Sequence, residues 1–128
     1  MSADVYRGAL EAVDRIVNRE SEADEVLRKT VEVLHDRFDH YLWVGIYLVE
    51  GDDLVLGPWK GPQVAENAEK IVVPIAYEGK IVGEIGIDSD RPAAFGEADR
   101  VFLERVALLI SPHSLVAWDT GGVAWREL

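Results

Sequence analysis

The sequence predicts an α+β domain in which an antiparallel sheet carries its helices on one face. Apolar residues recur at helical spacing before residue 38 and after residue 96, whereas between residues 41 and 88 they alternate with a period of two. The expected order is therefore two helices, two strands, a loop, two strands and a helix, which is typical of a sheet with segregated helices. The length of 128 residues fits a single compact domain over 1–128, with a core at about 20–110.

The helices are expected where apolar residues form one stripe. They are placed at residues 4–18, 21–38 and 96–110. Ser21, followed three residues later by Asp24, resembles a capping box, so Ser21 is expected to cap the second helix. Pro112 is expected to end the third helix, because proline has no N–H to continue the hydrogen-bond ladder. The remaining residues, 112–128, form the predicted C-terminal tail.

The strands are expected where residues of one parity share a face of the sheet. They are placed at residues 41–48, 54–59, 71–75 and 81–88. This alternation puts Leu42, Leu54, Val73, Ile81 and Ile85 beneath the helices. A short hairpin turn is expected at residues 78–80 between the last two strands.

The opposite, uncovered face of the sheet is the candidate binding site. It is expected to carry Tyr41 together with the candidate ligand-binding residues Trp43, Tyr47, Trp59, Lys70, Glu84 and Asp88. Aromatic side chains bury ligand surface, while a few charges fix its orientation. If the last two strands pair through a three-residue turn, Lys70 lies opposite Asp88 and the two charges neutralise one another. In the alternative interpretation the tail, Ser114–Leu128, folds over this face with Trp118 and Trp125; both hold if the tail forms a lid.

Composition excludes several classes of function. The formal net charge is −11, and an acidic surface repels phosphate backbones and anionic lipid, so neither nucleic acid nor a membrane is expected as a partner. The chain has no cysteine, which removes thiolate chemistry, disulfides and zinc–thiolate sites. It has no signal-like N-terminus and no apolar run of ~18 residues, so a soluble, cytoplasmic protein is expected.

Several linked segments resemble the GAF domain family. They are residues 43–48 (WVGIYL), 54–59 (LVLGPW), 71–75 (IVVPI), 81–89 (IVGEIGIDS) and 95–99 (FGEAD). Together they look closest to the GAF-type free methionine-(R)-sulfoxide reductases, over about residues 20–110. The resemblance implies a GAF-like fold and a ligand site on the sheet.

The chain departs from those reductases where their chemistry resides. The family carries its cysteines on a long insert between the second and third strands, whereas here only Gly57–Lys70 joins these strands and no cysteine is present. A thiolate is the nucleophile that makes attack on a sulfoxide feasible. Lys70 stands where the family has an acid, and Gly86–Asp88 retains one of two carboxylates. Both changes argue against free methionine sulfoxide, and Lys70 would instead favour a carboxylate or a phosphate.

The expected function is therefore that of a stand-alone, non-catalytic module that binds or senses an unidentified small molecule, without catalytic residues or cofactors. One alternative is a ligand-free interaction module that forms a homodimer through its helical face, using the first and last helices. The other is a cysteine-free relative that retains methionine sulfoxide binding or reduction.

Three further groups of residues are interpreted as structural. His35 and His40 are five residues apart and do not share a helix face, so no metal site is expected there. The carboxylates of Asp88–Asp90 suit a divalent cation but are more typical of a strand end. Residues 111–114 (SPHS) with Asp119 contain the residue types of a hydrolase triad without the nucleophile elbow that positions one.

Overall fold

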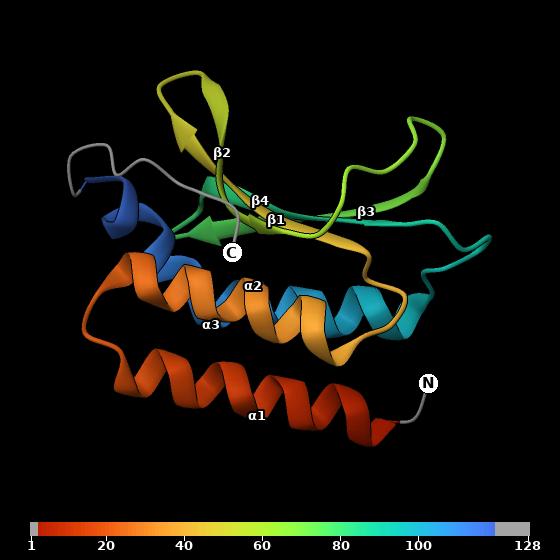
Figure 1. Cartoon of the computed structure of the whole chain (residues 1–128). Coiled ribbons are helices and arrows are strands. Elements are labelled where there is room, and N and C mark those ends of the chain that lie inside the picture. The colour runs from red at the N-terminus through yellow and green to blue at the C-terminus, as the bar shows by residue number, and fades with distance from the viewer. Residues whose placement is uncertain (1–2, 120–128) are drawn as a thin grey trace.

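The computed structural model describes residues 3–119 and places three helices on one face of a four-stranded sheet (Figure 1). The elements are α1 (Ala3–Arg19), α2 (Ala23–Arg37), β1 (Trp43–Glu50), β2 (Asp53–Lys60), β3 (Glu69–Tyr77), β4 (Lys80–Ser89) and α3 (Glu97–Asp119). The strand order is β2-β1-β4-β3, and every neighbouring pair is antiparallel. This arrangement confirms the predicted α+β class.

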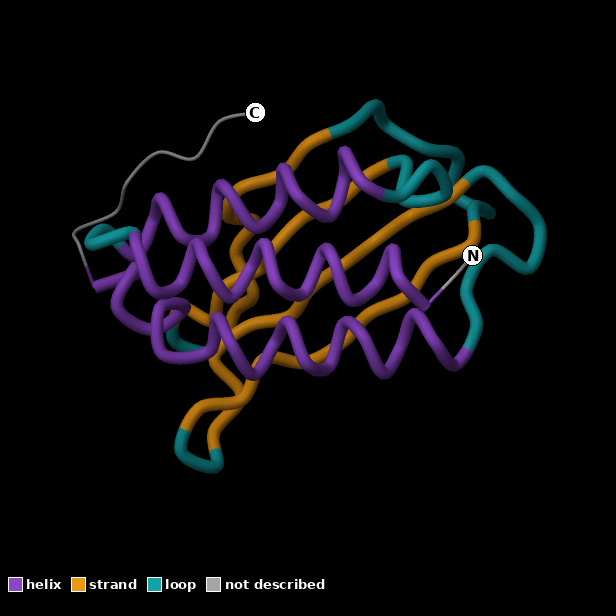
Figure 2. The backbone as a smooth tube through the Cα atoms, turned by 90° about the horizontal axis from the view of Figure 1, so that it is seen from below, coloured by secondary structure: helices purple, strands orange, loops and turns teal. Residues whose placement is uncertain are grey.

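The helices form two layers beneath the sheet. α2 and α3 pack directly on the strands, and α1 packs on these two helices from outside, as Figure 2 shows from the helical side. The core between the layers is built from fully buried aliphatic side chains of both, including Leu27, Leu34, Ile46, Ile85 and Leu103. Among residues 3–119 no helix is long and apolar enough to cross a membrane.

A bulge in β2 corrects the predicted faces of that strand. Gly45 pairs with Trp59 and Tyr47 pairs with Leu56, so two residues of β2 lie opposite the single residue between Gly45 and Tyr47. A bulge shifts side-chain alternation by one position. Leu56 and Trp59, which simple alternation puts on opposite faces, therefore share the uncovered face. Leu54 follows Leu56 there and is 46% exposed, so its predicted place beneath the helices is wrong.

A second irregularity corrects β4. The turn contains two residues, Glu78 and Gly79, both with positive φ, and an extra residue at Val82 then restores the register. Val82 is consequently buried and Ile81 is 55% exposed, so the predicted core position of Ile81 is wrong. Lys70 nevertheless lies opposite Asp88, because the shorter turn and the bulge together have the effect of a three-residue turn.

Two predicted helix ends also differ. The N-cap of α2 is Glu22 rather than Ser21, and no side chain caps this helix. α3 continues through Pro112 to Asp119. Pro112 cannot donate to the carbonyl of Leu108, but the Ser111 hydroxyl donates to that oxygen at 3.0 Å and satisfies it. The predicted tail is therefore helical up to residue 119, and the rest of it lies outside the described residues.

The carboxylate of Asp99, in the first turn of α3, is the centre of a buried polar cluster. It accepts hydrogen bonds from Tyr41 Oη (2.7 Å), His40 Nε2 (2.9 Å), the Gly96 amide (2.9 Å) and Tyr6 Oη (3.1 Å). Burial alone would raise the pKa of Asp99, but these hydrogen bonds outweigh it and hold the pKa below its usual value. The cluster joins α1, α3 and the segment before β1. Tyr41 therefore lies in the core. Its predicted place on the uncovered face is wrong.

Candidate functional site

The uncovered face of the sheet carries its side chains in rows that cross the strands. Trp43 lies opposite Asp88, and Asp88 lies opposite Lys70. Two rows further along, beyond the pair Gly45 and Gly86, Tyr47 lies opposite Glu84. The antiparallel register therefore brings five of the six predicted site residues onto neighbouring strands, and the β2 bulge adds Trp59 beside them.

A cavity of about 500 Å³ opens on this face. It is lined by Trp43, Tyr47, Leu56, Trp59, Gly61, Pro62, Gln63, Val64 and Asp88. Its volume lies within the range of small-molecule sites. Four of the predicted site residues thus line one cavity, whereas Lys70 and Glu84 lie on the same face of the sheet outside its lining.

The aromatic side chains lie across the strands. A methyl group added at Gly45 would come within 2.3 Å of Trp43 Cη2, so the indole ring covers this glycine. A methyl group at Gly86 would lie 3.2 Å from Tyr47 Cε2. The Trp43 ring is stacked with that of Trp59 and tilted against that of Tyr47, with centroids 6.3 Å apart in both pairs. Gly45 and Gly86 thus allow the Trp43 and Tyr47 rings to lie close to the backbone, and with Trp59 these rings form an aromatic platform.

An exposed ion pair and a second carboxylate lie at the edge of this platform. Lys70 Nζ lies 3.4 Å from Asp88 Oδ2, with the side chains 52% and 20% exposed, so the expected neutralisation is present. The pair is weak because it is exposed and long. Burial, and then the charges of Asp88 and Glu84, raise the pKa of the Tyr47 hydroxyl. The surroundings of Tyr47 are therefore net negative despite Lys70.

The loop between β2 and β3 supplies a wall that the sequence did not reveal. Gly61–Val64 line the cavity, although the sequence predicts only a loop between these strands. Gly61 has φ +117°, and a methyl group there would lie 2.2 Å from the Leu42 carbonyl oxygen. The glycine at position 61, between a strand and a proline, was the available signal for this close approach.

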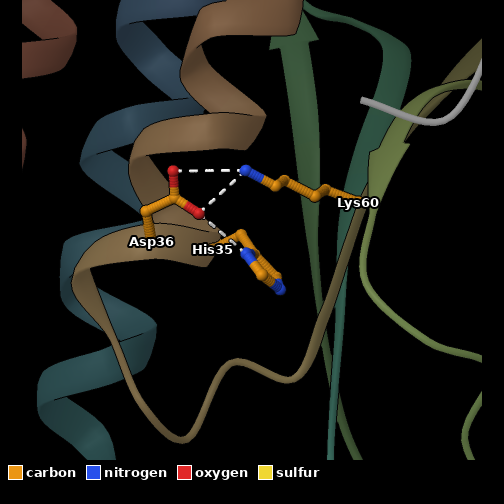
Figure 3. Close-up of polar contacts among 3 residues, drawn as sticks. All are labelled: His35, Asp36 and Lys60. Carbon is orange, nitrogen blue, oxygen red and sulfur yellow. Dashed lines mark hydrogen bonds and ion pairs between the residues drawn. The ribbon is translucent and has the colours of Figure 1, made fainter.

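An ion pair fixes the end of β2 just before this loop (Figure 3). Lys60 Nζ lies 3.0 Å from Asp36 Oδ1 in the last turn of α2, and His35 Nδ1 lies 2.9 Å from the same oxygen. The hydrogen bonds from His35 and from Lys60 lower the pKa of Asp36. The contribution to stability is small because Asp36 is exposed, but the pair holds the strand end against the helix.

The other candidate motifs have structural partners. His40 is bound to Asp99 and His35 to Asp36, so the two histidines contact different carboxylates. In the described part of the chain, no three His, Cys, Asp or Glu side chains are grouped as metal ligands. The hydroxyls of Ser111 and Ser114 bond to carbonyls of their own helix, at Leu108 and Ile110 respectively. Trp125 and the rest of residues 120–128 lie outside the described residues.

Comparison with known proteins gives the fold. No family model matches the chain, and no curated protein matches it in sequence. Among solved structures, a free methionine-R-sulfoxide reductase from Neisseria meningitidis in complex with its substrate has a TM-score of 0.80 at 24% identity, covering 94% of this chain and 96% of that one. The corresponding reductase of Staphylococcus aureus, also with substrate, has a TM-score of 0.76 at 23% identity, covering 85% and 95%.

A GAF domain of another kind of protein is similar over the same length. The GAF domain of an Acinetobacter phosphoenolpyruvate-protein phosphotransferase has a TM-score of 0.74 at 17% identity, covering 97% of this chain and all of that one (100%). Likeness at such identities establishes architecture, and the same architecture serves different activities. The chain has the GAF fold, shared with GAF domains and with the GAF-type free methionine-R-sulfoxide reductases.

Proposed function

We propose that this domain is a non-catalytic small-molecule-binding module whose ligand occupies the cavity on the aromatic face. The observation that carries the proposal is the convergence of three aromatic rings and Asp88 on a cavity of about 500 Å³. The same fold holds a substrate in the Neisseria reductase structure. The chain has no cysteine, so it supplies no thiolate for attack on a sulfoxide. Binding without turnover is the function that fits both facts.

A thermal-shift screen tests this proposal. Amino acids including methionine sulfoxide, nucleotides and carboxylic acids form the panel. A ligand at 100 times its Kd should add about 2.7 kcal/mol to the free energy of unfolding, which raises Tm by several degrees. Trp59→Leu should abolish the shift, because it removes one wall of the cavity. Ile81→Ser, on the same face of the sheet and outside the cavity lining, should leave it intact.

Two results would contradict this function. The first is a ligand whose shift survives in Trp59→Leu, which would place its site elsewhere. The second is turnover of methionine sulfoxide by the purified protein that is lost in Asp88→Ala, which would establish a cysteine-free reductase instead.

A second candidate function, self-association through the helical face, is favoured by the exposed side of α3. Val101, Leu108 and Leu115 are exposed and seven residues apart, so they form one stripe along the helix, and Leu108 is 71% exposed. Beside the stripe a groove is lined by residues of α1 and α3, namely Arg7, Leu10, Glu11, Asp14, Arg105, Leu108 and Leu109. The groove carries both signs of charge. Such a patch can be complementary to itself across a two-fold axis, so a second copy of the chain is the proposed partner.

Replacing Leu108 with glutamate should convert such a dimer into a monomer. The new charges would be buried against each other at the interface, which costs several kcal/mol. Light scattering coupled to size exclusion measures the mass. Leu54→Glu, at an exposed leucine of the sheet face, is the matched control and should leave the mass unchanged. A wild-type mass equal to one chain at micromolar concentration would refute self-association.

A further inference from the structure

The cavity combines three aromatic rings with a carboxylate. Among the described residues that line it, Asp88 is the one charged side chain, beside Trp43, Tyr47 and Trp59. Lys60 and Lys70, the basic residues near the cavity, are each engaged with a carboxylate, Asp36 and Asp88 respectively. The lining therefore offers negative charge and aromatic surface, and its other members are uncharged.

The Trp43 ring presents a face rather than an edge to the cavity. The Trp43 ring rests on Gly45, so one side of the ring contacts the sheet and the other faces the cavity. The face of an aromatic ring carries negative electrostatic potential and attracts a cation within ~6 Å of its centre. Trp59 and Tyr47 flank Trp43, with each pair of ring centroids 6.3 Å apart. A single cationic group seated on Trp43 would therefore have the Trp59 and Tyr47 rings as its neighbours.

The carboxylate at the edge of the platform sets what kind of cation fits. Asp88 Oδ2 already faces Lys70 Nζ at 3.4 Å, so part of its hydrogen-bonding capacity is taken by a primary ammonium of the chain itself. A further primary ammonium brings three N–H donors that need acceptors on burial. Asp88 is the one carboxylate in the part of the lining that residues 3–119 supply. A fully methylated ammonium has no N–H donors that need acceptors. Its methyl groups pack on aromatic rings, and its positive charge is attracted electrostatically by the carboxylate.

We propose that the cavity recognises a methylated ammonium group, with its methyls on Trp43, Trp59 and Tyr47 and its charge balanced by Asp88. This inference rests on the proposed function, since it names the ligand class of the same cavity. Lys70 lies at the rim of the cavity and competes with the cationic group of the ligand for the charge of Asp88. It therefore lowers the affinity for the ligand.

A pair of matched probes tests the ligand class. Choline carries a trimethylammonium group, and 3,3-dimethyl-1-butanol has the same shape with a neutral carbon in place of the nitrogen. Titration followed by calorimetry and by tryptophan fluorescence should show choline binding at least about tenfold more tightly than the neutral probe. Tetramethylammonium should compete with choline. Equal binding of choline and its neutral isostere, or binding of neither, overturns the methylated-ammonium inference.

Variants separate this inference from the proposed function. Lys70→Met should tighten choline binding about two- to fivefold by unmasking Asp88, whereas Lys80→Met makes the same charge change at the far end of β4 and should have no effect. Asp88→Asn should weaken choline binding while sparing the neutral probe. If a neutral or anionic ligand stabilises the protein and Trp59→Leu abolishes that effect, the ligand class is wrong and the binding function stands. If choline binds equally well to Trp59→Leu, the cavity is not its site and the inference fails.

Discussion

Replacing Asp99 with alanine is expected to lower the free energy of unfolding by about 3–5 kcal/mol, because it leaves buried donors without an acceptor. The carboxylate accepts hydrogen bonds from Tyr41, His40, Tyr6 and the Gly96 amide, and it is 4% exposed. Water cannot replace these bonds without opening the junction of α1, α3 and the segment before β1. The loss is therefore expected to exceed that of any single exposed ion pair in the domain.

Urea unfolding followed by circular dichroism measures this effect. Glu97→Ala is the matched control, because Glu97 is exposed two residues earlier on the same helix, and its cost should stay within about 0.5 kcal/mol. Asp99→Asn should give an intermediate loss, since the amide keeps one oxygen acceptor but turns a donor toward the cluster. A loss of less than about 1 kcal/mol for Asp99→Ala would show that water enters and replaces the carboxylate.

The pH dependence of stability identifies the charged form as the stabilising one. Burial would raise the pKa of Asp99, but the hydrogen bonds to it lower the pKa below its ordinary value of 3.8. A group with a depressed pKa in the folded state stabilises the fold above its unfolded pKa, and this contribution is lost as pH falls through the folded value. The gap in unfolding free energy between wild type and Asp99→Asn should thus be constant above about pH 5 and shrink below pH 3.8. A gap that stays constant down to pH 2 would contradict this.

The fold class and the order of the elements along the chain were accessible from sequence because they depend on periodicity, whereas the spatial strand order was not predicted. Residues of β1 and β3 alternate without interruption, so the faces of Trp43, Tyr47 and Lys70 could be assigned from parity alone. Where a bulge adds one residue, the residues beyond it lie on the opposite face of the sheet from the one that simple alternation predicts. This inversion moved Leu54 and Ile81 to the uncovered face. The bulged residues of β2 are Gly57 and Pro58, residue types that are typical of a bulge and were the available signal.

The site was partly predictable for the same reason. Trp43, Tyr47, Trp59 and Asp88 were all placed on this face by alternation; for Trp59 the assignment holds because the bulge offsets the wrong starting face of β2. The wall at Gly61–Val64 could not be predicted, because the path of an irregular loop depends on tertiary contacts rather than on a period. Part of the role of Asp99 could be predicted from the sequence, because an acid three residues after an N-cap accepts a hydrogen bond from the backbone amide of that cap. Asp99 accepts such a bond from the Gly96 amide. Its partners Tyr6, His40 and Tyr41 are distant in sequence and became visible only in the folded chain.

Gly61→Ala is expected to cost about 2–5 kcal/mol of unfolding free energy and to open the cavity wall. Gly61 has φ +117°, a conformation that side chains disfavour, and an added methyl would lie 2.2 Å from the Leu42 carbonyl oxygen and 2.9 Å from Trp43 Cα. Backbone cannot give way as the tip of a side chain can, so the loop must move away from Trp43. Unfolding in urea should change, and so should the fluorescence of the folded protein, to which Trp43 and Trp59 contribute two of the four tryptophans.

Gly51→Ala is the control that separates the cost of a positive φ from the cost of a steric clash with the added methyl group. Gly51 also has positive φ (+62°), but no atom lies within 4 Å of the position of the added methyl, so its cost should be about 1 kcal/mol and its fluorescence unchanged. Equal costs for the two variants would mean that the loop relaxes freely and that Gly61 does not hold the wall against Leu42. A larger cost at Gly61 together with weaker ligand binding would establish that the close approach of this glycine to β1 shapes the cavity, since the substitution touches none of the aromatic rings that line it.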